Sequence, residues 1–279
     1  MQKHNGNGGK QFQMPGFCRK IASYVRTRIL HIPQRIECED YDKKLLNENS
    51  AFGVVEAYRM LRTNLLYTGA LADHAIIGLT SAMPNEGKTL TCMNLAISFA
   101  MAGKKTLIID GDMRNPSQVK GFGTPIHLGL SEYLSGIRKD PVIQKTGRDN
   151  LFLMVAGKRP PNTAELLASP RMKELLESLR EEYDVIFLDL PPIGLVSDTM
   201  VVAEMVDGMM LVVQAGESDA RNVQAAIATL EQMKAHILGV VLNNVSQKSG
   251  GYGRYGRYGK YGKCGSYGAY GAPAEANEK

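Results

Sequence analysis

The sequence predicts an α/β fold built on a doubly wound, mostly parallel β-sheet, with a basic arm before it and a Tyr/Gly-rich tail after it. Apolar residues make up 44% and charged residues 22% of the 279-residue chain, which is typical of a globular protein. Short, nearly continuous apolar runs alternate with segments whose apolar residues recur every three or four positions. Strands that are apolar on both faces and separated by helices are typical of a parallel sheet covered on both sides.

The predicted elements occupy a single domain, residues 37–246. The expected strands are Ala75–Thr80, Thr106–Asp110, Leu151–Val155, Val185–Asp189, Gly208–Gln214 and Ile237–Asn243. The expected helices are Thr89–Ala102, Ala164–Glu182 and Asp219–Ala235, with a further one around residues 56–62. The apolar runs stay far below the 18 or more residues of a membrane span. The four cysteines are widely separated, which argues against a disulfide scaffold or a zinc knuckle and favours the reducing cytoplasm.

Residues 1–36 form a basic arm with seven Lys or Arg residues and no Asp or Glu. Its first part is rich in Gly, Asn and Lys and is expected to be disordered. Residues 17–26 combine basic and apolar side chains, as a short amphipathic helix does. Two interpretations stay open: a helix that rests on an acidic membrane surface or a partner's tail, and a solvated arm without a fixed partner.

Residues 247–279 form a tail with seven consecutive triplets from residue 252, each with glycine in second place. Cys264 begins one triplet, and tyrosine begins the others: Tyr252, Tyr255, Tyr258, Tyr261, Tyr267 and Tyr270. The triplets offer no aliphatic side chain larger than alanine for burial. We therefore expect a disordered, solvated tail with accessible tyrosine hydroxyls.

A P-loop is predicted where strand Ala75–Thr80 runs into SAMPNEGKT at residues 81–89, followed by a helix. Backbone N–H groups at the helix N-terminus favour an anion such as phosphate. Lys88 would reach the β- and γ-phosphates, and the Thr89 hydroxyl would ligate magnesium. The residues expected to contact the nucleotide on this loop are Pro84, Asn85, Glu86, Gly87, Lys88, Thr89 and Leu90.

Three acidic residues follow predicted strands. Asp110 and Asp112 end the strand after the P-loop helix, and Asp189 ends the strand that precedes Pro191-Pro192. Carboxyl ends of parallel strands meet at the ligand-binding edge of such a sheet, and Mg²⁺ would allow carboxylates to lie beside a triphosphate. We expect Thr89, Asp110, Asp112 and Asp189 to hold Mg²⁺ directly or through water, with Lys88 and the three acids forming the catalytic centre.

Together these motifs resemble the bacterial tyrosine kinases of the capsule and exopolysaccharide type, in the form that has a separate membrane activator. The resemblance covers about residues 50–271. It includes Gly129-Leu130-Ser131, the segment from Pro160 to Leu167, and the tyrosine-rich tail. It also includes a Glu-x-x-Arg-x-x-Arg helix at residues 56–62.

The resemblance implies an ATP- and Mg²⁺-dependent tyrosine kinase that phosphorylates its own tail between subunits of a ring-shaped homo-oligomer. Glu56, Arg59 and Arg62 would lie at the subunit contact, and Asn243 would contact the adenine. A transmembrane polysaccharide co-polymerase would activate the kinase at the inner face of the plasma membrane. A phosphotyrosine phosphatase and other protein substrates are further implied partners. Asp110 and Asp112 both remain candidates for accepting the tyrosine proton.

The P-loop departs from related sequences at two positions, and two other functions compete with the kinase interpretation. Ala82 stands at the first glycine of the usual P-loop, and Met83 replaces a second lysine found in relatives that position cell-division sites or partition plasmids. The main alternative is such a MinD/ParA-like ATPase whose basic aromatic tail binds nucleic acid or membrane; the kinase interpretation expects no nucleic acid. The other is an inactive scaffold. Charged residues spaced three positions apart, as on the helix at residues 56–62, most often form an exposed, ion-paired surface.

Overall fold

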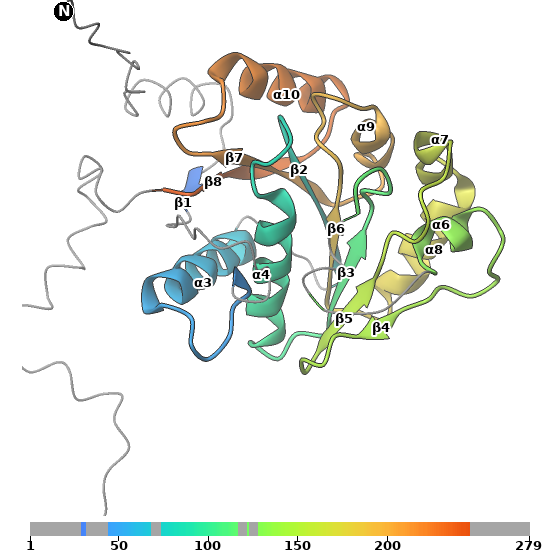
Figure 1. Cartoon of the computed structure of the whole chain (residues 1–279), viewed down its shortest axis with the longest axis horizontal. Helices are drawn as coiled ribbons and strands as arrows, with labels where there is room; N and C mark the ends of the chain where they lie inside the picture. The colour runs from blue at the N-terminus through green and yellow to red at the C-terminus, as the bar shows by residue number, and fades with distance from the viewer. Residues whose placement is uncertain (1–28, 32–43, 68–73, 117–121, 123–127, 246–279) are drawn as a thin grey trace, which may run out of the picture. The chain divides into compact units, whose positions relative to one another are not determined.

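The computed structural model describes residues 29–31, 44–67, 74–116, 122 and 128–245. Within these residues, one eight-stranded sheet organises the fold (Figure 1). Its strands are β1 (Ile29–His31), β2 (Ala75–Ser81), β3 (Thr106–Asp110), β4 (Gln144–Lys145), β5 (Leu151–Met154), β6 (Val185–Asp189), β7 (Gly208–Gln214) and β8 (Ile237–Asn243). Their order is β1-β8-β7-β2-β6-β3-β5-β4, and neighbouring strands are parallel except β4 and β5. The predicted doubly wound, mostly parallel sheet is confirmed.

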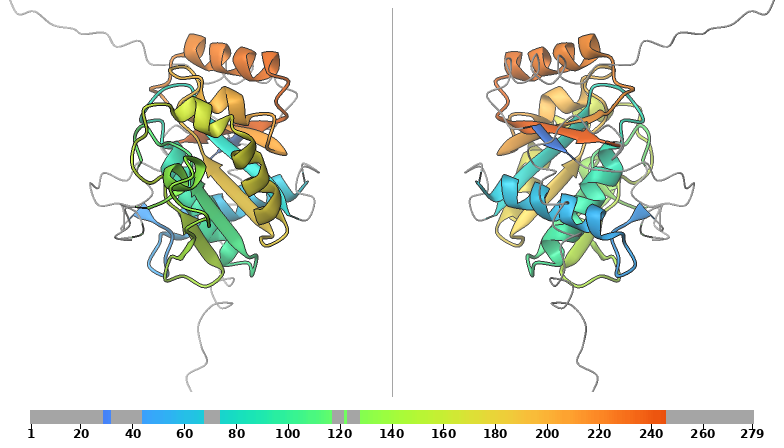
Figure 2. Two further views of the ribbon diagram at one scale, coloured as in Figure 1. Left: turned by 90° about the vertical axis from the view of Figure 1, so that its right-hand side faces the viewer. Right: turned by 90° about the vertical axis from the view of Figure 1, so that its left-hand side faces the viewer.

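Helices cover both faces of this sheet. They are α3 (Phe52–Tyr67), α4 (Lys88–Ala100), α6 (Leu130–Leu134), α7 (Thr163–Leu167), α8 (Pro170–Arg180), α9 (Asp198–Val202) and α10 (Ala220–Gln232). Figure 1 shows α3 and α4 on one side and α6, α7 and α8 on the other. Figure 2 shows α10 running over β7 and β8.

The alternating direction of side chains along each strand explains why both faces of the sheet have a hydrophobic cluster. Ile77 and Leu79 of β2 pack with the apolar side chains of α3 and α4. Ile76 of the same strand joins a second cluster with side chains of α8 and α10. Because successive strand residues point to opposite faces, a strand in the middle of the sheet has to be apolar throughout. That is the pattern the sequence shows.

The prediction of one helix over Ala164–Glu182 is wrong, because α7 and α8 are separate there. The Ser169 side chain accepts a hydrogen bond from the Met172 N–H and caps α8, and Pro170 occupies the first turn. Proline at this position is compatible with the start of a helix, but it cannot continue a preceding one. The break therefore follows from two adjacent residues, although the apolar periodicity runs across them.

Two short strands extend the sheet beyond the six predicted ones. β1 lies within the predicted N-terminal arm and pairs in parallel with β8, and β4 is an antiparallel edge strand beside β5. The rest of the arm and the predicted tail, including its six tyrosines, lie outside the described residues. In the described part of the chain, none of the helices combines the length and the apolar character that crossing a membrane would require.

Candidate functional site

The carboxyl ends of three neighbouring strands bring the predicted site residues together. Asp110 of β3 lies opposite Asp189 of β6 in the strand register, and Leu79 of β2 lies opposite Asp189 from the other side. A cavity of about 450 Å³ opens beside these strand ends. Its lining residues are Lys44, Pro84, Asn85, Gly87, Lys88, Thr89, Leu90, Asp112, Arg114, Asn115, Pro191, Pro192, Leu195 and Val196. The cavity thus contains most of the loop predicted to contact a nucleotide.

The P-loop turns into α4 through two residues with positive φ angles. Asn85 and Gly87 adopt left-handed conformations, with φ of 65° and 86°. A side chain at Gly87 would meet Asn243, since a Cβ there would lie 2.0 Å from the Asn243 Nδ2. That Nδ2 donates a hydrogen bond of 3.2 Å to the Glu86 carbonyl. Asn243, predicted to contact the adenine, is therefore placed directly against the P-loop at the end of β8.

Glu86 braces the loop from inside. Its Oε2 accepts a 2.9 Å hydrogen bond from the Met83 N–H, and the Ser218 hydroxyl donates to its Oε1. The Ser218 oxygen in turn accepts from the Gln214 N–H at the end of β7. Glu86 was predicted to contact the nucleotide, but its buried side chain is directed into the protein. Glu86 is also the one residue of the predicted nucleotide-binding set on this loop that does not line the cavity.

Lys88 is the first residue of α4, and its ammonium group lies among buried acids. Its Nζ is 3.0 Å from the Asp112 Oδ2, 3.3 Å from the Asp189 Oδ1 and 3.3 Å from the Thr89 hydroxyl. Burial alone would lower the pKa of Lys88, but the negative charges of Asp189 and Asp112 raise it above its ordinary value. The lysine is therefore firmly charged at neutral pH.

Asp110 and Asp112 have different positions in this arrangement. Asp110 is fully buried, and its Oδ1 accepts a 3.1 Å hydrogen bond from the Asp112 N–H. Asp112 lines the cavity, and its Oδ1 accepts from the Asn115 N–H at 3.1 Å. Of the two candidate proton acceptors, Asp112 is thus the one that a molecule in the cavity can reach.

An ion pair connects the loops after β3 and β6. The Arg114 guanidinium donates two hydrogen bonds of 2.8 Å to Asp198, whose side chain is fully buried at the start of α9. These hydrogen bonds raise the pKa of Arg114 above its ordinary value. Bidentate pairs of this kind fix geometry as well as charge. The loops after β3 and β6 are consequently fixed relative to each other.

The donor set fits a magnesium ion that is shared with a nucleotide. Among the described residues, no group of three or more His, Cys, Asp or Glu side chains is arranged as a preformed metal cage. Mg²⁺ is usually bound through one or two carboxylates, waters and substrate phosphates rather than by an all-protein cage. The Thr89 hydroxyl and the Asp112 carboxylate both contact the Lys88 ammonium, and both are oxygen ligands of that type.

Sequence reasoning missed several residues of the cavity, among them Lys44. The buried side chain of Asn94 on α4 binds the backbone of this segment. Its Nδ2 donates a 3.1 Å hydrogen bond to the Lys44 carbonyl, and its Oδ1 accepts a 2.8 Å hydrogen bond from the Leu46 N–H. Asn94 also contacts the buried Tyr58 hydroxyl, and burial raises the pKa of Tyr58 to about 12. This packing brings a segment far from the P-loop in sequence to the cavity.

The predicted oligomer-contact residues all lie on α3, but their side chains differ. Glu56 and Arg59 form a partly exposed ion pair of 2.7 Å. Arg62 instead donates to the Ser98 backbone carbonyl and, at 3.2 Å, to the Ser98 hydroxyl on α4. Arg62 therefore joins α3 to α4 within one chain, and Glu56 and Arg59 remain on the surface.

Comparisons with known proteins agree with this fold. A family model described as an AAA domain matches residues 76–243. Over 200 residues the chain is 40% identical to "Tyrosine-protein kinase CpsD" of Streptococcus pneumoniae, a match that covers 71% of this chain and 87% of that protein. Among solved structures, the kinase domain of Escherichia coli tyrosine kinase ETK is similar with a TM-score of 0.74 and 32% identity, covering 85% of this chain and 96% of that one. MinD of Pyrococcus horikoshii in complex with Mg-ADP is similar with a TM-score of 0.52 and 26% identity, covering 60% and 69%.

Proposed function

The chain belongs to the bacterial tyrosine-protein kinases, and from this premise we propose that it transfers the γ-phosphate of ATP to tyrosines of its own C-terminal cluster, mainly between subunits. Through this reaction it regulates capsular or exopolysaccharide synthesis and export. Its substrates include other protein tyrosines, and a phosphotyrosine phosphatase reverses the modification. The chain acts in the cytoplasm, at the inner face of the plasma membrane, where a transmembrane polysaccharide co-polymerase activates it.

The observation that carries this proposal is the position of Lys88. Its ammonium contacts Asp112 and Asp189 at the start of a helix, beside a cavity lined by the P-loop. Phosphoryl transfer depends mainly on alignment and on neutralising the charge of the transferred group. A lysine held between acids at a helix N-terminus meets both requirements once the phosphates of ATP replace one of its partners.

The residues of the site divide the chemistry among them. Thr89, Asp110, Asp112 and Asp189 would hold Mg²⁺ directly or through water, and the ion would supply positive charge that offsets the charge of the phosphates. Lys88 stabilises the transferred group. The tyrosine oxygen forms a bond to the γ-phosphorus while the bond from that phosphorus to the β-phosphate oxygen breaks, and ADP leaves. Asp112 accepts the tyrosine proton, because it is the acid that lines the cavity.

The chain length after the domain suits transfer between subunits. Between 6 and 24 positions separate Ser246 from the six tyrosines. As a flexible chain, a segment of this length spans roughly 13–29 Å. Transfer between subunits requires a neighbour's cavity within such a distance in a ring-shaped homo-oligomer, and tethering would raise the local concentration of acceptor tyrosines there. Glu56, Arg59 and Arg62 contribute to the contact between subunits in this proposal.

Mass spectrometry of the purified full-length chain after incubation with ATP and Mg²⁺, with and without its membrane activator, tests the proposal. We expect phosphate on Tyr252–Tyr270, and at least about 100-fold less in Lys88→Met. Lys173→Met is the matched control, since Lys173 is an exposed lysine of α8. ATP hydrolysis with an unmodified tail, even in the presence of the activator, contradicts the proposal. If that tail also binds RNA or membrane, the MinD/ParA-like alternative holds instead.

A further inference from the structure

We propose that the loop after β6 forms an apolar subsite that receives the phenol ring of the acceptor tyrosine, with Leu195 as its central contact. This inference rests on the proposed kinase function and specifies which surface recognises the acceptor. Pro192, Leu195 and Val196 all line the cavity that contains Lys88 and Asp112. The cavity therefore has a phosphate-binding side and an apolar side.

The apolar side is held rigidly against the beginning of the P-loop. The Ile193 N–H donates a 2.9 Å hydrogen bond to the Ser81 carbonyl, and Gly194 lies so close to Ala82 that a Cβ there would be 2.4 Å from the Ala82 oxygen. The Pro191 carbonyl accepts hydrogen bonds of 2.7 Å from the hydroxyls of both Thr80 and Thr199. These contacts hold the backbone of the loop in one position beside the P-loop.

Leu195 is the side chain that this loop presents. It remains 55% exposed, whereas its neighbour Ile193 is buried at 5%. A single exposed leucine is common on protein surfaces. Here, however, it lies beside Pro192 and Val196 in a cavity that also contains charged groups, and apolar walls with a few polar groups are characteristic of ligand sites. The wall thus suits a ligand with an apolar ring and a reactive polar end.

Of the groups in the proposed reaction, the tyrosine ring fits this wall best. The triphosphate is proposed for the P-loop side, and the adenine is expected near Asn243, which donates to the Glu86 carbonyl and is not among the residues that line this cavity. The phenol is the remaining group, and its hydroxyl has to reach Asp112, which shares the cavity with Leu195. The chain supplies six tyrosines in the segment that follows the described residues, each followed by glycine. Glycine leaves the ring free of bulky neighbours on that side.

Steady-state kinetics test this subsite in the full chain with its six tail tyrosines replaced by alanine, using a synthetic peptide of repeated Arg-Tyr-Gly as the acceptor. We expect Leu195→Ser to raise KM for the peptide about tenfold, because part of the ring loses its apolar contact. KM for ATP should change less than twofold, and Leu195→Met should restore the peptide KM. Ile137→Ser is the matched control, since Ile137 is an exposed aliphatic residue that is not part of this lining. Val196→Thr provides a second variant on the same wall.

Two results would overturn the subsite. One is an unchanged peptide KM in both Leu195→Ser and Val196→Thr; the other is a rise in KM for ATP that matches the rise for the peptide, which would place the adenine on the wall. Binding of labelled Tyr, Phe and Ala versions of the peptide, with a non-hydrolysable ATP analogue present, separates this inference from the kinase proposal. We expect the Tyr and Phe peptides to bind about tenfold more tightly than the Ala peptide, and only when Leu195 is intact. Equal binding of the three contradicts the subsite, whereas preferential binding without transfer contradicts the kinase proposal alone.

Discussion

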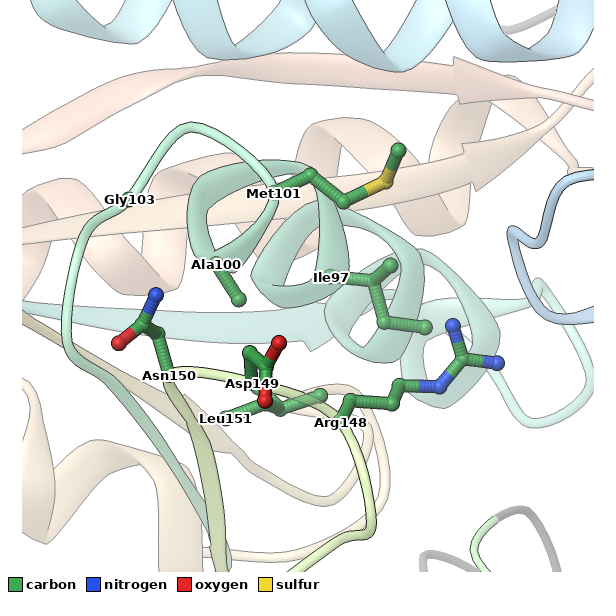
Figure 3. Close-up of a pocket in the computed structure, with 8 residues that line it drawn as sticks. All are labelled: Ile97, Ala100, Met101, Gly103, Arg148, Asp149, Asn150 and Leu151. Atoms are coloured by element: carbon green, nitrogen blue, oxygen red, sulfur yellow. The ribbon is translucent and has the colours of Figure 1, made fainter.

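The two ends of the sheet each carry a cavity, and their chemistry differs. At the carboxyl ends of the strands, the larger cavity of about 450 Å³ includes Lys88 and Asp112, both nearly buried. Near the amino ends of β3 and β5, a cavity of about 370 Å³ lies between the end of α4 and residues 148–151 (Figure 3). Its charged lining residues are the partly exposed Arg148 and the exposed Asp149, and Arg148 donates to the Leu46 carbonyl. Cavity size alone thus does not identify the functional end of the molecule.

The charged groups at the two ends also differ, both in how deeply they are buried and in how many like charges lie together. At the amino end, Asp207 accepts two hydrogen bonds from Arg180 and one from the Ile76 N–H, so each charge has its partners at a partly exposed position. At the carboxyl end, Asp110, Asp112 and Asp189 are buried together, and the Lys88 ammonium contacts two of them. Like charges that are crowded in this way raise the free energy of the folded state. Such crowding indicates a site arranged for a cation, such as the Mg²⁺ that accompanies a nucleotide, rather than for stability.

Asp189→Asn should have the largest effect and separates activity from stability. We expect phosphate transfer to the tail to fall at least about 100-fold, because the site loses one of the carboxylates proposed to hold Mg²⁺ directly or through water. The melting temperature should not fall, because the change removes one of three crowded carboxylates and leaves Lys88 paired with Asp112. Tail phosphorylation and thermal unfolding of the same preparation provide the measurements. A clear loss of stability would show that the charges at this edge serve the fold, and the contrast between the two ends would fail.

Glu132 tests whether a buried carboxylate near the carboxyl ends can be purely structural. It accepts hydrogen bonds from the Gly129 and Lys158 N–H groups and from the Ser131 hydroxyl. Burial opposes its charge, but these bonds lower the pKa of Glu132 overall. Its stabilising contribution is therefore present above the ordinary glutamate pKa and is lost as the pH falls through the lowered value. We expect Glu132→Ala to reduce the free energy of unfolding by about 2 kcal/mol at pH 7.

Urea unfolding of the wild type and Glu132→Ala at pH 7 and at progressively lower pH measures this contribution. The difference between the two proteins should shrink once the pH is below the ordinary glutamate value. ATP binding by the folded variant should be unchanged, since Glu132 is not among the residues that line the P-loop cavity. A difference that stays constant with pH would mean that the lost contacts do not depend on the charge.

How much the sequence predicted depends on whether a feature is local. The six longer strands were predicted because each is a continuous apolar run, whereas β1 and β4 have only three and two residues and exist through pairing with β8 and β5. In the site, Lys88 and the three acids follow from motifs. Leu195 could not be predicted, because its place in the cavity depends on how Gly194 packs against Ala82.

Asp207→Ala, at the amino end of the sheet, should lower stability and leave activity nearly unchanged, which is the opposite of the result expected for Asp189→Asn. Removing Asp207 leaves the Ile76 N–H and the Arg180 guanidinium without this acceptor, so we expect a loss of about 1 kcal/mol, modest because the pair is partly exposed. The rate of tail phosphorylation by folded protein should stay within twofold of the wild type. Chemical unfolding and initial-rate measurements check both parts. A large fall in activity at full stability would mean that the amino end communicates with the site.

Arg59→Ala should have the smallest effect on stability and tests a third kind of charge, the exposed pair on α3. The pair with Glu56 is solvated, so its loss should change the free energy of unfolding by less than about 0.5 kcal/mol. If this surface is the subunit contact, the same change lowers the molecular mass measured by light scattering, because arginine at an interface is desolvated and contributes more there than on a free surface. Arg221→Ala is the matched control, since Arg221 forms a similar exposed pair with Asp219 on α10. Equal masses for the wild type and both variants would make the α3 pair an ordinary surface feature, and the contrast would then lie between the two ends of the sheet alone.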